Sequence, residues 1–104
     1  MRAIVLTSVA QVQFRAARDW YEAIRPGLGG QFTNTLDQAL SIVRRHPAQF
    51  KIAMNQYRRA LVKRFPYELF FEFNDEQIIV YSVFHTSQNP TRWVSLLNES
   101  LTQK

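Results

Sequence analysis

The segment YRRALVKRFPYELFFEFNDEQIIVYSVFHTSQNPTRW, residues 57–93, decides the fold because it predicts three consecutive strands. We place the first strand at Tyr57–Arg64, the second at Tyr67–Asn74 and the third at Gln77–His85. The link Asn74-Asp75-Glu76 is rich in turn-forming residues and is too short for the crossover that parallel strands need. The three strands are therefore expected to form an antiparallel meander.

The second of these strands alternates between two kinds of face. One face is expected to be dry, and it consists of Tyr67, Leu69, Phe71 and Phe73. The other is expected to be mostly wet, and it consists of Glu68, Phe70 and Glu72. On the third strand, either the face with Ile78 and Val80 or the face with Ile79 and Val83 is expected to lie beside this dry face. The combined apolar surface then needs another layer to cover it.

Upstream, apolar residues recur every three or four positions, which predicts two amphipathic helices that supply this layer. We expect Ser8 to cap the first helix, with Gln11 completing a capping box. Its inward stripe is Val9, Val12, Ala16, Ala17, Trp20, Tyr21 and Ile24. The second helix is predicted from about Gln31 to Arg45, with the stripe Phe32, Leu36, Ala39, Leu40 and Val43. The link at residues 26–30, PGLGG, turns the chain so that the helices pack as a hairpin.

Two further segments complete the predicted fold. Arg2–Thr7 is expected to join the sheet as an additional strand, and Thr91–Leu101 is expected to form a short C-terminal helix. The fold class is therefore α+β: an N-terminal strand, a helical hairpin, the antiparallel three-stranded meander and the C-terminal helix. With 104 residues, we expect residues 1–104 to form a single domain.

Composition excludes several classes of protein. The chain has no cysteine, and its two histidines, His46 and His85, are far apart, so we expect neither a metal nor a cofactor. The N-terminus lacks the apolar run of a signal peptide, and no stretch approaches the length needed to span a membrane. We therefore expect a cytoplasmic protein with no membrane partner.

The positive charge is concentrated in one segment. The net charge is +5, and no acidic residue occurs between Asp37 and Glu68. The cations in that interval are Arg44, Arg45, Lys51, Arg58, Arg59, Lys63 and Arg64. Such a segment favours an anionic partner, which is nucleic acid, a ribosome or an acidic protein tail, although a solvated basic face without a partner has the same composition. Arg58 and Arg59 point to opposite faces of a regular strand, so only one of them can join a shared site.

The order of motifs resembles the RelE/ParE toxin superfamily of bacterial type II toxin–antitoxin modules. The motifs that carry the resemblance are Arg58-Arg59, Arg64-Phe65-Pro66-Tyr67, Val83-Phe84-His85 and Asn89-Pro90-x-x-Trp93. Upstream, Trp20-Tyr21, Pro26-Gly27-Leu28-Gly29 and Phe32 are similar to the ParE-like, plasmid-stabilisation branch. The resemblance covers nearly the whole chain and implies the β–α–α–β–β–β fold and the function of a toxin.

The superfamily includes ribosome-dependent mRNA interferases and gyrase-directed toxins. For an RNase, the candidate catalytic residues are His85, Arg59, Lys63 and Arg64, although His85 is also suited to anchoring the following loop. The arginine that RNase members carry early in the middle strand is replaced by Tyr67 or Glu68, and residues 85–90 lack the family's arginines. The resemblance therefore implies a ParE-like inhibitor of DNA gyrase that acts by binding. The alternatives are an mRNA interferase that acts on the ribosome and mRNA, and a non-toxic nucleic-acid- or protein-binding module.

The resemblance also implies a cognate antitoxin with a DNA-binding N-terminal part, so that operator DNA is reached only through the antitoxin. Its flexible C-terminal tail is expected to be acidic and amphipathic. We expect the tail to place apolar anchors on the helical hairpin and carboxylates against Arg58, Arg59 or Arg64.

Overall fold

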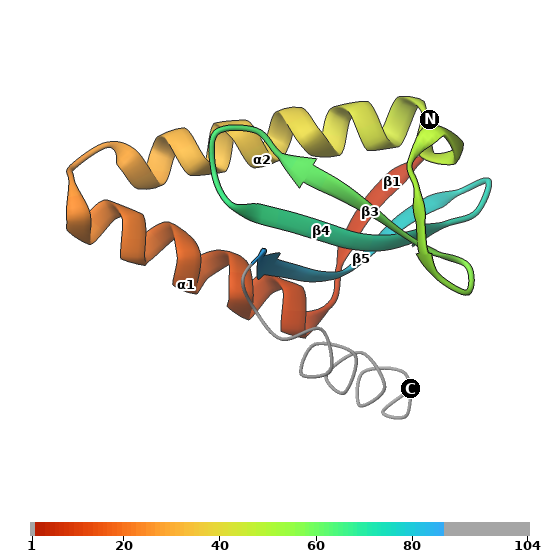
Figure 1. Cartoon of the computed structure of the whole chain (residues 1–104), viewed down its shortest axis with the longest axis horizontal. Coiled ribbons are helices and arrows are strands. Elements are labelled where there is room, and N and C mark those ends of the chain that lie inside the picture. The colour runs from red at the N-terminus through yellow and green to blue at the C-terminus, as the bar shows by residue number, and fades with distance from the viewer. Residues whose placement is uncertain (1, 87–104) are drawn as a thin grey trace.

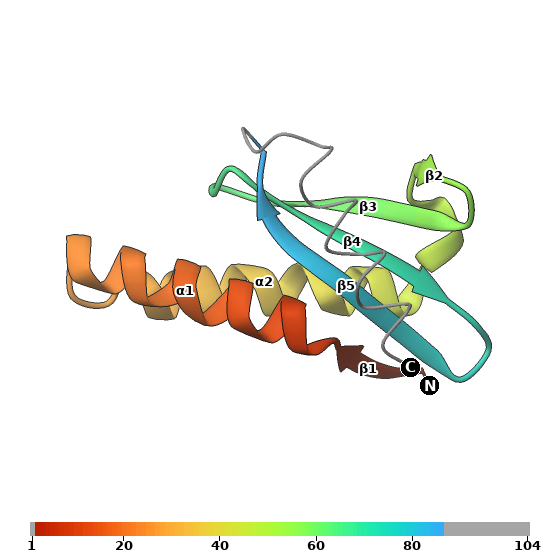
Figure 2. The same ribbon diagram turned by 90° about the horizontal axis from the view of Figure 1, so that it is seen from below.

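The computed structural model describes residues 2–86 of the chain. In chain order it contains β1 (Ala3–Leu6), α1 (Ser8–Ile24), α2 (Leu28–Arg45), a short 3₁₀ helix (Pro47–Gln49), β2 (Ile52–Met54), β3 (Tyr57–Val62), β4 (Tyr67–Phe73) and β5 (Gln77–His85). The strands form one sheet in the order β1-β5-β4-β3-β2. Helices α1 and α2 lie side by side on one face of this sheet (Figures 1 and 2). The α+β architecture is thus as predicted, while the predicted C-terminal helix lies outside the described residues.

The antiparallel meander is confirmed, and the N-terminal strand joins it. Strand β3 pairs antiparallel with β4, and β4 pairs antiparallel with β5. The Asn74 side chain holds the tight turn between β4 and β5, because its Oδ1 accepts hydrogen bonds from the backbone N–H groups of Glu76 and Gln77, both at 2.8 Å. Strand β1 runs parallel to β5 at the edge of the sheet, with Ala3 opposite Gln77.

The predicted strand Tyr57–Arg64 begins at Tyr57 as expected, but the structure differs from prediction before this strand and at its end. The sequence analysis missed β2, which has only three residues and an irregular register against β3, so it shows no alternation to detect. Strand β3 ends at Val62 rather than Arg64. Arg64 has a φ of 70°, in the left-handed region, and lies in the turn that leads to β4.

The first helix is capped one residue earlier than predicted. Thr7, not Ser8, is the N-cap, and its Oγ1 accepts a hydrogen bond of 3.1 Å from the backbone N–H of Ala10. The Gln11 side chain donates to the carbonyl oxygen of Leu6. The extended backbone of Thr7 is the geometry that an N-cap requires.

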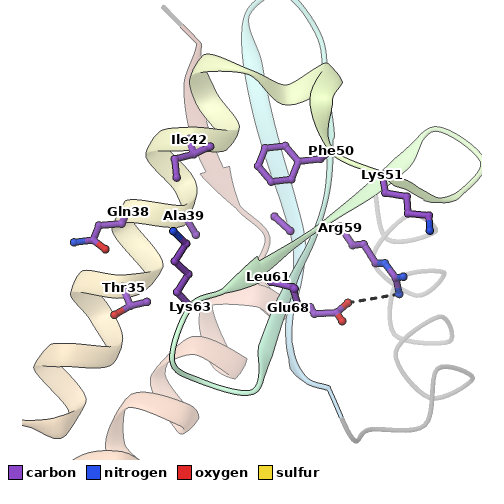
Figure 3. A pocket seen from close by; sticks show the side chains of 11 residues that line it. Thr35, Gln38, Ala39, Ile42, Phe50, Lys51, Arg59, Leu61, Lys63 and Glu68 are labelled. Carbon is purple, nitrogen blue, oxygen red and sulfur yellow. Dashed lines mark ion pairs between the residues drawn. The ribbon is translucent and has the colours of Figure 1, made fainter.

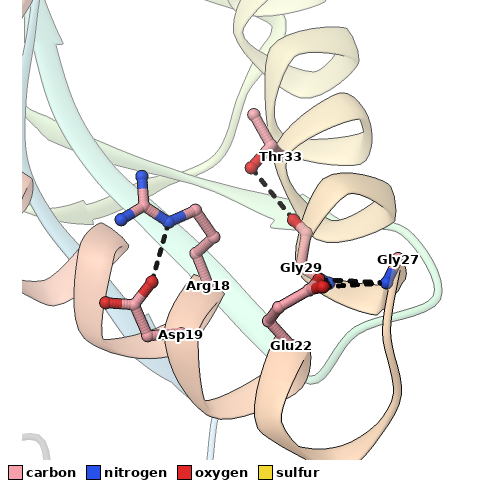
Figure 4. Close-up of polar contacts among 6 residues, drawn as sticks. All are labelled: Arg18, Asp19, Glu22, Gly27, Gly29 and Thr33. Carbon is pink, nitrogen blue, oxygen red and sulfur yellow. Dashed lines mark hydrogen bonds and ion pairs between the residues drawn. The ribbon is translucent and has the colours of Figure 1, made fainter.

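The second helix begins at Leu28, three residues before the predicted start. Gly27 turns the chain with a φ of 91°, and the Glu22 carboxylate of α1 accepts hydrogen bonds from the N–H groups of Gly27 and Gly29 at 3.0–3.1 Å (Figure 4). A side chain at Gly29 would place its Cβ 2.7 Å from the carbonyl oxygen of Arg18. Gly29 therefore allows close contact between the helices, and the Glu22 carboxylate caps α2 in place of a local side chain.

Removing this cap should destabilise the hairpin. We expect Glu22→Ala to lower the free energy of unfolding by about 1–2 kcal/mol, since N–H groups at a helix N-terminus lose their charged acceptor. Urea denaturation followed by circular dichroism measures the change. Asp37→Ala, which removes an exposed carboxylate from the middle of α2, is the control and should stay within about 0.5 kcal/mol. Equal midpoints for the two variants would show that the Glu22 contacts contribute nothing.

The main core lies between the helices and the sheet. Leu69 and Phe71 of the predicted dry face are fully buried there. A bulge between β4 and β5 pairs Phe70 with Ser82 and Phe71 with Val80. Because Tyr81 is the extra residue, both Val80 and Val83 belong to the main core, which a regular strand would not allow.

The other face of the sheet is not mostly wet, contrary to prediction. Four aromatic residues form a second buried cluster: Tyr57, Phe70, Tyr81 and Phe84. The Tyr81 hydroxyl donates a short hydrogen bond to the Glu72 carboxylate. Burial, together with this bond, raises the pKa of the Tyr81 hydroxyl. Glu68 and Glu72, which suggested an exposed face, are only partly exposed.

Helix α1 also departs from the predicted burial pattern. Ala17 and Tyr21 are buried, but Val12, Trp20 and Ile24 are 62%, 61% and 57% exposed. The spacing combined two neighbouring stripes, and only one of them faces the sheet. Among residues 2–86, neither helix is long and apolar enough to cross a membrane.

Candidate partner-binding groove

A groove with a volume of about 550 Å³ lies between helix α2 and strand β3 (Figure 3). Its apolar part consists of Ala39, Ile42, Phe50, Ala60 and Leu61. Its polar part consists of Thr35, Gln38, Lys51, Arg59, Lys63 and Glu68. The groove therefore combines apolar surface with three cations and one carboxylate.

The groove exists because β2 covers only the beginning of β3. The register pairs β2 with Tyr57 and Arg58, and no described strand pairs with residues 60–62 on that side. The backbone N–H of Arg59 donates to the carbonyl oxygen of Lys51 on the β2 side. By alternation, the N–H of Leu61 points toward the same open edge. Leu61 is 69% exposed, and Ile42 is 40% exposed on the facing helix.

The charged groups lie around this apolar surface. Figure 3 shows Lys63 extending along the groove toward Ala39, whereas Arg59 points toward Glu68. The Arg59–Glu68 ion pair is long, at 4.0 Å, and half of the Arg59 side chain is exposed. Such a pair contributes little stability, so Arg59 is available to a better-placed carboxylate.

A second hollow continues along α2 toward its N-terminus. It shares Thr35, Gln38 and Lys63 with the groove and adds Arg64 and Phe65 from the turn after β3. Four of the predicted anion-binding residues therefore line two adjoining hollows: Lys51, Arg59, Lys63 and Arg64.

The other three predicted cations lie elsewhere. The Arg58 guanidinium donates to the carbonyl oxygens of Ala48 and Phe50, at 3.2 and 2.6 Å, and lies over the ring of Phe73. These contacts hold the segment before β2 against the sheet, which is a structural role. Arg44 and Arg45 are in the last turn of α2, as predicted, and line neither hollow.

His85 lies at the end of β5 and lines a different hollow from the cations proposed to act with it. Its ring contacts Tyr67, with 5.3 Å between centroids, and it lines a hollow with Gln13, Ala16 and Trp20 of α1. Arg59, Lys63 and Arg64 do not line that hollow. Within the part of the chain that the structure describes, no cluster of His, Asp and Glu is suited to a metal ion.

Sequence reasoning found the cations of the groove but missed its apolar residues. Leu61 stands between two cations in a strand and alternates with buried Ala60 and Val62, so its exposure was already implied by the pattern. Ile42 gave no such signal, because it precedes Val43 of the inward stripe and only the structure shows that it faces the groove.

The chain was also compared with known proteins. Residues 4–90 match the family model for the ParE toxin of the type II toxin–antitoxin system parDE. A search of curated proteins found no significant match. Among solved structures, a chain of the chromosomal ParDE toxin–antitoxin system from P. aeruginosa has the same fold, with a TM-score of 0.71 and 15% identity. The alignment covers 82% of this chain and 96% of that one. The family match spans most of the sequence, and the chain therefore belongs to the ParE toxin family.

Proposed function

We propose that the chain is the toxin of a type II toxin–antitoxin module, neutralised by a cognate antitoxin that binds the groove between α2 and β3. The observation that carries this proposal is the combination of exposed Leu61 and Ile42 with Lys51, Arg59 and Lys63 in one groove. An acidic amphipathic segment matches both properties at once, because its apolar side chains cover the first set and its carboxylates pair with the second.

The open edge of β3 supports the same assignment. An extended segment laid along residues 60–62 would meet backbone groups that no described strand pairs with, as well as apolar side chains. Arg58 is left out of this contact because its guanidinium already donates to two carbonyl oxygens. Arg64, in the adjoining hollow, extends the cationic surface beyond the strand.

For the target, we propose DNA gyrase, inhibited by binding in the cytoplasm rather than by turnover of a substrate. Glu68 lines the groove next to Arg59, where a carboxylate would repel a scissile phosphate. His85 lines a different hollow from the three cations that an RNase mechanism would require. The alternative is an mRNA interferase that uses His85, Arg59, Lys63 and Arg64. In either case, operator DNA would be bound through the antitoxin.

Controlled induction of the chain in a bacterium separates these activities. We expect growth to stop, gyrase-dependent DNA breaks to accumulate and mRNA to remain intact, and His85→Ala should behave in the same way. Breaks are measured on isolated plasmid, and transcript ends are mapped in the same cells. Cleaved mRNA that becomes intact in His85→Ala would establish the interferase instead. Unaffected growth would contradict the toxin assignment.

A further inference from the structure

Helix α1 carries an exposed apolar stripe that neither the core nor the groove uses. The stripe consists of Val12, Ala16, Trp20 and Ile24, which recur every four residues and are all exposed. Residues at this spacing lie one above the other on a helix surface. A continuous exposed apolar stripe that includes a large aromatic side chain is typical of a protein–protein contact.

A hollow of about 500 Å³ opens beside the small residue of this stripe. Ala16 lies at its edge, with Gln13 and Trp20 from the same helix and Tyr67 and His85 from the ends of β4 and β5. The Gln13 side chain is fixed there, because its Oε1 accepts hydrogen bonds from the Ser82 hydroxyl and the Val83 N–H. Hydrogen bonds therefore hold one wall of the hollow in place, and aromatic rings form part of its lining.

We propose that α1 packs antiparallel against α1 of a second copy of this chain, with Trp20 of each copy entering the hollow beside Ala16 of the other. The order of large and small residues along the stripe indicates that the partner is a second copy. A two-fold axis near residue 18 exchanges positions 16 and 20, and it also exchanges positions 12 and 24. Large Trp20 therefore meets small Ala16, and Val12 meets Ile24, so the stripe is complementary to itself.

The charges near this axis permit the contact. Arg18 lies almost opposite Trp20 around the helix, and its Nε pairs with Asp19 at 3.0 Å, so each copy neutralises these two charges itself. Rows of residues spaced by four pack with helices crossing at about −50°. One stripe and one hollow make a small interface, so we expect a weak, concentration-dependent dimer. The groove between α2 and β3 shares none of these residues, so dimerisation is separate from the antitoxin binding proposed above.

Light scattering and sedimentation of the purified chain over a range of concentrations test the proposal. We expect Trp20→Ala and Ala16→Trp each to raise the dissociation constant of the dimer about tenfold or more, since one removes the aromatic anchor and the other fills its hollow. Arg25→Ala, an exposed change at the residue that follows the same helix, should leave the constant unchanged. Unfolding midpoints show that each variant is folded.

The orientation of the helices is tested in the same sample, because the chain has no cysteine of its own. A short bis-maleimide should link Val12→Cys to Ile24→Cys in a mixture far more than it links either variant to itself. A monomer at all concentrations, a dimer that Trp20→Ala leaves intact, or preferential linkage of Val12→Cys to itself would each overturn the proposal. Weaker antitoxin binding by Trp20→Ala, without any dimer of the parent chain, would assign the stripe to the antitoxin instead.

Discussion

Replacing Lys51, Arg59 and Lys63 together by alanine is expected to weaken binding of the cognate antitoxin about a hundredfold, or about 2.7 kcal/mol. All three cations line the groove, and Arg59 has only a long ion pair with Glu68 to give up. Carboxylates that become desolvated against such cations contribute more than exposed pairs do, and removing one side leaves the other charge unpaired. Calorimetric titration with the product of the neighbouring gene measures the change.

The matched control removes the same charge from elsewhere on the molecule. Arg15, Arg25 and Arg45 are exposed and line neither hollow along α2, so their triple alanine variant should bind within about twofold of the parent. Only the groove variant should lose most of the salt dependence of the affinity. If the groove variant also binds within twofold at low and high salt, the antitoxin binds elsewhere, and the toxin assignment still stands on the induction experiment.

The alternation of apolar residues in the strands and their three- to four-residue spacing in the helices predicted the fold well, because both patterns arise from the burial of one face of an element. They failed where burial has a cause outside the local pattern. Trp20 satisfies the helical spacing but lies on an exposed stripe that none of the elements within residues 2–86 covers. Phe70 alternates with Glu68 and Glu72, yet it is buried with Tyr57 and Tyr81 in a second aromatic cluster. Periodicity shows that residues share a face but not whether that face is covered.

The candidate site was predictable only in part for a similar reason. Arg59 and Lys63 are four positions apart in the predicted strand, with Leu61 between them, so their common face followed from the sequence. Arg58 looks equivalent in the sequence, but its guanidinium is used by the carbonyl oxygens of Ala48 and Phe50. That role depends on the 3₁₀ helix Pro47–Gln49 and Phe50, a segment too short to show a periodic pattern. The groove itself depends on β2 being shorter than β3, which only the tertiary structure reveals.

Phe32→Ala should have the largest effect on stability, a loss of about 3–5 kcal/mol in the free energy of unfolding. Phe32 is fully buried at the centre of an aromatic cluster. Its ring centroid lies 5.2–6.2 Å from those of Phe14, Tyr21, Phe65 and Tyr67. The cluster joins both helices to the β3–β4 turn. The cavity that Phe32→Ala leaves therefore cannot close by a movement of one element alone. A domain of this size has a total stability of about 5–15 kcal/mol, so the variant should be only marginally folded.

Trp20→Ala is the control, because it removes a larger aromatic side chain that is 61% exposed. Urea denaturation of both variants, at a concentration where the chain is monomeric, compares burial directly. We expect Trp20→Ala to change the free energy of unfolding by less than about 0.5 kcal/mol. The thermal midpoint of Phe32→Ala should fall by about 4–8 °C for each kcal/mol lost. A loss below about 1 kcal/mol for Phe32→Ala would mean that the helices pack on the sheet without this cluster.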